Sequence, residues 1–294
     1  MSRLRPFDLI GQRMHVARIA VAVCATLAVS SADCALAADW LGDSGLRGSL
    51  MPTNYARWDG WQFGALVGYG NLNTDFGNST SAQIAFILRN TTLEAEGAPS
   101  TWTTLPANST NAAIFGGFLG YNMQWDQLVL GWDLAYRHPS ILQTSAADSM
   151  SRRFDTSDNI QHDVTIAAQA SFKLVDYAVL RARAGYAVGQ FLPYAALGAA
   201  VGRFNYQTTV SVTDVMTNLA PPGPLGGAGT FQQSGSVGQN NVFVAGFAAG
   251  IGVDWALTQM VFARAEWEFI AFAPVNQTRS NVQAGHVGLG VRFW

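Results

Sequence analysis

The end of the chain constrains its fold more than any other segment. Val287, Leu289, Val291 and Phe293 alternate with small or polar residues, and Trp294 follows as the last residue. A period of two places the four apolar side chains on one face of a β-strand. Transmembrane β-barrels end on such a strand, because it must pair with the first strand to close the wall. We therefore expect the segment from Val287 to Trp294 to close a barrel and to act as an assembly signal.

The amino end has the pattern of a secretory signal peptide. A leader with four arginines precedes a short apolar core at residues 19–29, and Ala35-Leu36-Ala37 resembles a cleavage site. We expect cleavage after residue 37, although Met14 is an alternative start, and we expect residues 38–57 to form a periplasmic lead-in to a barrel over 58–294. Loss of the leader removes both cysteines, Cys24 and Cys34. It also removes four arginines and two aspartates, which takes the formal charge from −2 to −4.

The composition fits a protein with one face in lipid. Charged residues make up 12 % of the chain, against about 25 % in typical globular proteins. Aromatic residues make up another 12 %, and there are 30 glycines. No basic patch suggests nucleic-acid binding. After the leader, no apolar run reaches the roughly 18 residues that a membrane helix needs.

Alternating segments predict eight strands. Seven have clear limits, at about 58–70, 112–124, 127–137, 192–205, 241–255, 260–272 and the closing segment. The fourth is ambiguous, because 163–173 and 177–187 both alternate. We interpret 163–187 as one long strand that projects beyond the membrane. Two separate strands are the alternative, but bacterial single-chain barrels have even strand numbers.

The connections between these strands alternate in length. Short turns are expected at 125–126, 189–190 and 256–259, and longer outer loops at 71–111, 139–161, 207–240 and 273–281. Outer-membrane barrels have short periplasmic turns and long extracellular loops. Aromatic residues should form two interfacial belts. The periplasmic belt would contain Trp58, Trp61, Trp125, Tyr194, Trp255, Phe293 and Trp294, and the outer belt Tyr69, Phe115, Tyr136, Phe204, Phe243 and Phe269.

Several short motifs resemble those of a known family. They are Trp58-Asp59-Gly60-Trp61-Gln62-Phe63-Gly64, Phe115-Gly116-Gly117-Phe118-Leu119-Gly120-Tyr121-Asn122, Leu180-Arg181-Ala182-Arg183-Ala184-Gly185-Tyr186, Leu192-Pro193-Tyr194, Gly250-Ile251-Gly252-Val253-Asp254-Trp255 and Glu266-Trp267-Glu268. Their order is similar to that in small alphaproteobacterial outer-membrane β-barrels, the porin-family or 25/31-kilodalton major outer-membrane proteins. The resemblance implies an eight-stranded antiparallel transmembrane barrel in the Gram-negative outer membrane. That family usually ends on the aromatic that matches Phe293, so the added Trp294 is a departure.

The strand pattern turns several charged side chains into the barrel. An eight-stranded barrel has an interior just wide enough for side chains to fill. Buried charges must be paired, and arginine forks suit carboxylates. We therefore predict a lumenal network of Asp133, Arg181, Arg183, Asp254, Arg264, Glu266, Glu268 and Arg292, with trapped water. Its role would be to hold the barrel together, or alternatively to form a gate or narrow polar path.

Enzyme signatures are weak in this sequence. His138 and His162 fall in or near a predicted loop, and His286 lies on the closing strand. Ser140 and Ser145 are near His138, but no nucleophile elbow, metal-ligand cluster or phosphate loop appears. We expect no catalysis, no cofactor and no metal.

Three functional hypotheses follow from the sequence. The first is an envelope-integrity role for a structural barrel whose exposed loops contact ligands or other cells. The second is a small-solute pore, and the third a lipid-modifying enzyme. Expected partners are outer-membrane lipid, lipopolysaccharide and the barrel-assembly machinery, and we expect a monomer. Pro221-Pro222-Gly223-Pro224 should mark a flexible outer loop.

Overall fold

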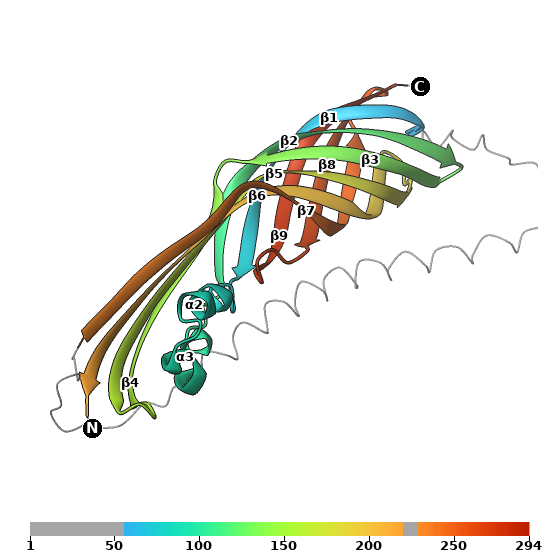
Figure 1. Ribbon diagram of the computed structural model, residues 1–294. Coiled ribbons are helices and arrows are strands. Elements are labelled where there is room, and N and C mark those ends of the chain that lie inside the picture. Colours follow the sequence, from blue (N-terminus) through green and yellow to red (C-terminus); the bar gives the residue numbers. More distant parts are fainter. Residues whose placement is uncertain (1–55, 220–228, 294) are drawn as a thin grey trace, which may run out of the picture. The chain divides into compact units, whose positions relative to one another are not determined.

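The computed structural model describes residues 56–219 and 229–293, and nearly all of them lie in antiparallel strands (Figure 1). The strands are β1 (Gly60–Asp75), β2 (Asn108–Trp125), β3 (Leu128–Pro139), β4 (Leu142–Asp155), β5 (Ile160–Tyr186), β6 (Phe191–Asn218), β7 (Gly229–Ala256), β8 (Val261–Phe272) and β9 (Arg279–Phe293). Three short helices lie between β1 and β2: α2 (Ser81–Ile87), α3 (Thr92–Gly97) and the 3₁₀ turn η1 (Pro99–Thr101).

Eight of the nine strands close into a ring. The first strand pairs with the last over nearly its whole length, from Trp61 opposite Phe293 to Asp75 opposite Arg279. The ring then passes through β2, β3, β5, β6, β7 and β8, with β3 bonded directly to β5. The predicted fold class, an eight-stranded antiparallel barrel, is confirmed, and the closing strand lies where its alternation placed it.

The ambiguous fourth segment forms the single strand β5, which is 27 residues long. Its second half pairs with β3 inside the ring, and its first half pairs with β4, from Leu142 opposite Leu174 to Asp155 opposite Gln161. A register shift lies between Leu174 and Asp176, where the two halves meet. The strand therefore crosses the ring and continues out of it as an extension.

Two predicted outer loops are wrong, because most of each forms strand. The segment 139–161 contains β4, and the segment 207–240 supplies the outer parts of β6 and β7. The β6 part alternates as strands do, with Val210 and Val212 buried and Thr209 and Ser211 partly exposed. Most of the outward residues are polar rather than apolar, which explains why the pattern suggested loops. The four strands β4 to β7 make a sheet that continues past the ring (Figure 1).

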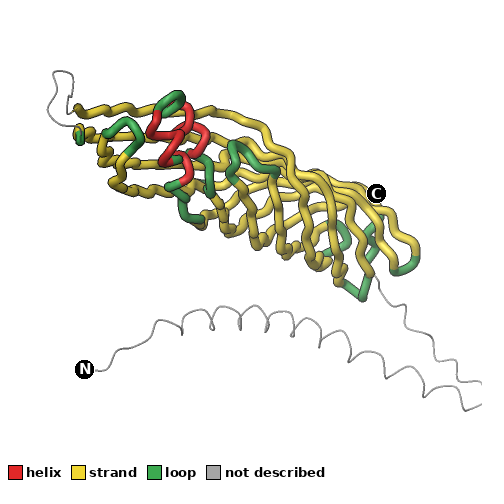
Figure 2. Tube along the Cα trace, turned by 60° about the horizontal axis from the view of Figure 1, so that its bottom comes forward, coloured by secondary structure: helices red, strands yellow, loops and turns green. Residues whose placement is uncertain are grey.

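The helices α2 and α3 cover the inner face of this sheet (Figure 2). Ile84 and Leu88, from α2 and its C-cap, and Leu93 of α3 are buried in one apolar cluster with sheet residues such as Val164 and Val212. Trp102 packs edge-on against Phe154 with ring centroids 5.8 Å apart. The segment between β1 and β2 is therefore a folded cap, which we call the helical cap (residues 76–107).

The outer face of the ring is apolar. Outward side chains such as Phe63, Leu134, Leu197 and Leu289 are each more than 40 % exposed, which is unusual for large hydrophobic residues outside a membrane or an interface. Trp61, Trp125, Trp255 and Phe293 are exposed near the short turns, and Tyr69, Phe115, Tyr136 and Phe243 are exposed toward the extension. Three belt assignments are wrong: Trp58, Tyr194 and Phe204 are buried inside.

Several expectations concern residues outside the described part of the chain. These are the signal peptide (1–37), most of the lead-in (38–57), the turn at Pro221-Pro222-Gly223-Pro224 and Trp294. Among the described residues, no helix is both long and apolar enough to cross a bilayer.

Candidate functional site

Charged side chains gather inside the ring, where β3, β5, β7 and β8 each turn alternate residues inward. Four arginines and four carboxylates lie there, and each is at most 4 % exposed. They are Asp133 and Arg137 on β3, Arg181 and Arg183 on β5, Asp254 on β7, and Arg264, Glu266 and Glu268 on β8. We call this group the lumenal ion cluster.

Arg181 is the centre of the cluster. Its Nε and Nη2 donate to the two carboxylate oxygens of Asp133 at 2.9 and 3.1 Å. Its Nη1 donates to Glu266 at 2.8 Å and to Glu268 at 3.1 Å, and its Nη2 makes a second bond to Glu266 at 3.0 Å. One guanidinium thus contacts three carboxylates, two of them in the bidentate geometry that makes such pairs strong.

A second group surrounds Asp254. Arg264 donates to its two oxygens at 2.8 and 2.9 Å, and Arg183 donates at 2.7 Å. The two groups touch where Arg264 Nη1 lies 3.6 Å from Asp133 Oδ2. Aromatic faces complete the surroundings: Arg264 stacks 4.0 Å from the Phe118 ring. With equal numbers of arginines and carboxylates, each charge in the cluster has a partner of opposite sign, as buried charges require. Some nitrogens of Arg137, Arg183 and Arg264 have no hydrogen-bond partner among the described residues.

The structure brings together seven of the eight residues that the sequence placed in the network. The exception is Arg292, which donates to the backbone oxygens of Gln259 and Thr258 in the turn between β7 and β8. Sequence reasoning left out Arg137, which lies 3.3 Å from Glu266. It also missed the buried hydroxyls of Tyr177 and Tyr194, which donate to Glu268 and Glu266. The alternation along β3 could have identified Arg137, because it lies on the same inward face as Asp133.

Buried side chains fill the lumen on both sides of the ion cluster. Beside the short turns, Trp58, Val129, Leu192 and Phe262 belong to one buried cluster. Toward the extension, the inward residues are Ile114, Val179, Ala200, Ala248, Ile270 and Ala284, and they are continuous with the core under the helical cap. Buried polar side chains also lie beside the short turns, namely Gln62, Asn122 and Arg292, the last 4.3 Å from the centre of the Trp58 ring. The described part of the lumen therefore has a mixed layer, then the ion cluster, then an apolar layer toward the extension. An ion that crossed it would lose its hydration in that apolar layer.

The three histidines of the described residues lie in different settings. His138 is exposed near the outer end of β3, and His286 is buried beside the ion cluster on β9. His162 was expected in or near a loop but lies on β5, buried beneath the helical cap, with Nδ1 2.6 Å from Asp214 Oδ2. A cavity of about 410 Å³ adjoins this pair, lined by residues that include Leu93 and Phe231. In the described residues no hydroxyl is hydrogen-bonded to His162, and no group of acidic, histidine or cysteine side chains could hold a metal.

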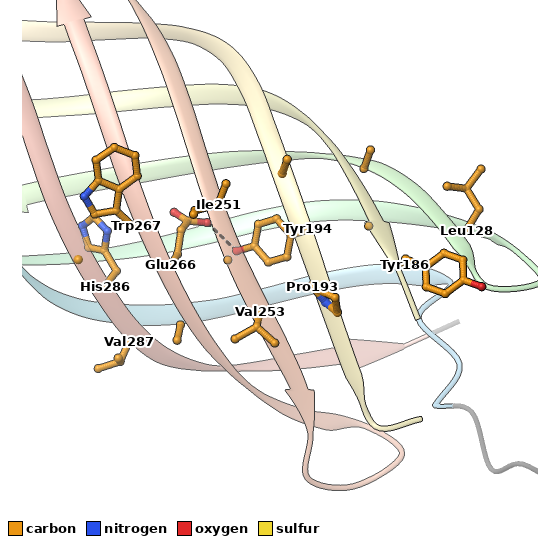
Figure 3. Close-up of a pocket in the computed structure, with 16 residues that line it drawn as sticks. Leu128, Tyr186, Pro193, Tyr194, Ile251, Val253, Glu266, Trp267, His286 and Val287 are labelled. Atoms are coloured by element: carbon orange, nitrogen blue, oxygen red, sulfur yellow. Dashed lines mark hydrogen bonds between the residues drawn. The ribbon is translucent and has the colours of Figure 1, made fainter. Parts of the chain in front are cut away.

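A shallow hollow of about 960 Å³ lies on the wall formed by β5 to β9 (Figure 3). Small residues such as Ala195 and Gly252 form part of it, and Trp267 and Ile251 are among the large side chains around it. Figure 3 shows the Tyr194 hydroxyl bonded to Glu266, which belongs to the ion cluster. The hollow is almost wholly apolar, so an acyl chain suits it better than a polar substrate.

Comparisons with known proteins give only distant similarities. No protein-family model and no curated protein matches the chain. The solved structures that match include the attachment invasion locus protein Ail of Yersinia pestis, with 12 % identity, a TM-score of 0.30, and coverage of 80 % of this chain and 99 % of Ail. OprG of Pseudomonas aeruginosa has 11 % identity, a TM-score of 0.36, and coverage of 80 % and 97 %. Neisserial surface protein A has 11 % identity, a TM-score of 0.34, and coverage of 79 % and 97 %.

The fold assignment depends on the strand pairing of this chain rather than on those similarities. A closed antiparallel ring, an apolar outer face and short turns at one end define an integral outer-membrane β-barrel protein. The resemblance to the alphaproteobacterial 25/31-kilodalton proteins stays a prediction, because no family model tests it.

Proposed function

We propose that this protein is a closed, non-conducting barrel that reinforces the outer membrane and carries a rigid sheet beyond it. One observation carries the proposal: an apolar layer that includes Phe204 and Phe272 lies across the lumen between the ion cluster and the extension. A pore needs a polar path from one mouth to the other. Here the charged side chains pair with one another rather than line an open path. Their ion pairs link β3, β5, β7 and β8 across the lumen.

This role fits the remaining expectations for the chain. Insertion would use the alternating closing strand, Val287 to Phe293, as the feature that the barrel-assembly machinery recognises. The apolar outer face would contact membrane lipid, and the monomer would suffice because the ring closes on itself. The resemblance of the sequence motifs further suggests that the chain is a member of the alphaproteobacterial family of small outer-membrane proteins.

Single-channel recording on the full refolded chain tests the proposal. We expect no discrete current steps in a planar bilayer. The matched variant replaces Phe204 and Phe272 by serine, because these rings lie 4.9 Å apart in the outer apolar layer. A hydrated layer should then pass small ions, which would identify that layer as the barrier. Discrete steps in the unaltered protein would overturn the closed-barrel proposal in favour of a pore.

A further inference from the structure

The outer face of the extension has an unusual composition. Over its part of the sheet, β5 turns outward Thr165, Ala167, Gln169, Ser171 and Lys173. The inward residues between them are apolar and buried under the helical cap. Lys173 is the only charged residue of these five, and the next outward residue, Asp163, is paired with Arg153 of β4. Solvated protein surfaces usually carry far more charge, since about a quarter of residues in typical chains are charged.

Over the same part of the sheet, the outward residues of the neighbouring strand, β6, are also polar and uncharged. Asn205, Gln207, Thr209, Ser211 and Thr213 of β6 lie outward, and the pairing places Asn205 beside Lys173 and Thr213 beside Thr165. All five side chains carry an amide or a hydroxyl, each of which both donates and accepts hydrogen bonds.

The flanking strands widen this face on both sides. On β4, Ser145 and Ser149 lie opposite Ser171 and Ala167, and on β7, Ser234 and Ser236 lie opposite Ser211 and Thr209. Four strands and five outward rows span roughly 14 Å by 27 Å at ordinary sheet spacings. We call this surface the polar face (outward residues 143–151, 165–173, 205–213 and 232–238).

Two hollows lie along the polar face. One, of about 500 Å³, lies over the small side chains of Ala147, Ala167 and Ser211. The other, of about 300 Å³, is lined by amides that include Gln143 and Gln207, and by Lys173. Residues 167–169 of β5 border the larger hollow with residues 209 and 211 of β6. Residues 171 and 173 of β5 border the smaller one with residues 205–207 of β6, so the two hollows follow one another along the same pair of strands.

The position of the polar face relative to the membrane narrows the choice of partner. The outward face of β5 continues from lipid-facing Leu180 within the ring to Lys173 just beyond it. Between them, Asp176 pairs with Arg203 and accepts a hydrogen bond from Tyr136 at 3.0 Å. The polar face therefore points away from the barrel axis, into the layer directly above the lipid head groups of the outer leaflet. In a Gram-negative outer membrane that layer contains the sugars of lipopolysaccharide.

We propose that the polar face binds the uncharged sugar chains of the lipopolysaccharide around the barrel. Sugar hydroxyls need partners that both donate and accept, and the face supplies these at regular spacing. Phosphate groups would need arginines or lysines that are free to bind them. Arg153 and Arg203 at the ends of the face are paired with Asp163 and Asp176, and Lys173 alone is too few. A protein partner would need an apolar or aromatic centre, and the five outward rows contain no large apolar side chain. The inference extends the proposed envelope role by giving the extension a ligand.

Binding of lipid-free polysaccharide to the full refolded chain tests this inference. The probe is the polysaccharide released from smooth lipopolysaccharide by mild acid, and its dissociation constant is measured by calorimetry in detergent. We expect saturable binding that weakens at least tenfold in Ala167→Trp, which fills the larger hollow, and in Gln169→Ala with Gln207→Ala, which removes amides without adding bulk. The matched control is Val215→Trp, an exposed position on the same face of β6 beyond the hollows. It should change the dissociation constant less than twofold.

Three results would overturn the inference. The first is no saturable binding of the released polysaccharide by the unaltered chain. The second is binding that appears only when lipid A is attached, because the membrane anchor would then be the ligand. The third is concentration-dependent association of the chain that Ala167→Trp abolishes, because the polar face would then join two copies. A heat-dependent gel shift in every variant shows that the barrel is folded, and the conductance test of the closed barrel is unaffected by any of these outcomes.

Discussion

Replacement of Arg181 by methionine should destabilise the barrel more than any exposed arginine replacement. Methionine has a similar length but no charge, so the substitution removes the guanidinium without leaving a large cavity. Removal of one partner from a buried ion pair typically costs about 3–5 kcal/mol, because the other charge remains buried and unpaired. Arg181 contacts three carboxylates, so the upper part of this range is expected.

The remaining partners of each carboxylate show where the cost arises. Glu266 keeps Arg137 at 3.3 Å and the Tyr194 hydroxyl at 2.7 Å. Glu268 keeps the Tyr177 hydroxyl at 3.3 Å and the longer contact with Arg137 at 3.8 Å. Asp133 would keep the 3.6 Å contact with Arg264 but neither of its hydrogen bonds from Arg181. Asp133 is therefore the carboxylate that loses most, and the substitution Asp133→Asn in the Arg181→Met background should recover at least about 1 kcal/mol, within the range of coupling between contacting residues.

Urea unfolding in phospholipid vesicles, followed by tryptophan fluorescence, measures these differences. The matched control is Arg153→Met, because the Arg153–Asp163 pair has side chains 65 % and 39 % exposed. An exposed pair contributes at most about 1 kcal/mol. If Arg181→Met lowered the unfolding free energy by no more than the control does, the lumenal ion cluster would not hold the barrel together and the reasoning would be refuted.

Three further predictions test the seam, the cap and assembly. A Cβ at Gly288 would lie 2.1 Å from the Ala65 oxygen, across the seam of β1 and β9, so Gly288→Ala should cost about 1–3 kcal/mol in the same titration; Gly285→Ala on the same strand has open space and should cost nothing measurable. Leu88→Ala should make the helical cap sensitive to added protease, because Leu88 is fully buried, whereas Phe86→Ala at a 65 % exposed position should leave the digestion rate unchanged. Phe293→Ala should slow the appearance of the heat-modifiable folded band in cells without changing the unfolding free energy by more than about 1 kcal/mol, since Phe293 is 42 % exposed on the outer face.

The ring could be predicted from sequence because lipid on one side and a packed interior on the other force a period of two. That constraint weakens beyond the membrane, and the prediction failed there. In the outer part of β6 the inward residues are still apolar and buried at every second position, as Val210 and Val212 are, but most of the outward ones are polar; in the outer part of β7 even the inward face carries glutamines, Gln233 and Gln239. Low average hydropathy then suggested loops. The helical cap was missed for a related reason: α2 has seven residues and α3 six, too few for a helical period to be recognised.

In the lumenal ion cluster, some contacts can be predicted from the alternation of residues along each strand, and others depend on closure of the barrel. The alternation of residues predicted that Asp133 and Arg181 point inward. The strand register places them directly opposite each other on β3 and β5. Their pairing is thus a local property of two neighbouring strands. The contact of Arg181 with Glu266 is different, because it joins β5 to β8 across the lumen. It exists only because closure of eight strands brings opposite walls within reach of two long side chains. A change that widened the ring would therefore break the Arg181–Glu266 contact first and leave the Arg181–Asp133 pair intact. The bonds across the lumen are thus the part of the cluster that depends on closure of the barrel.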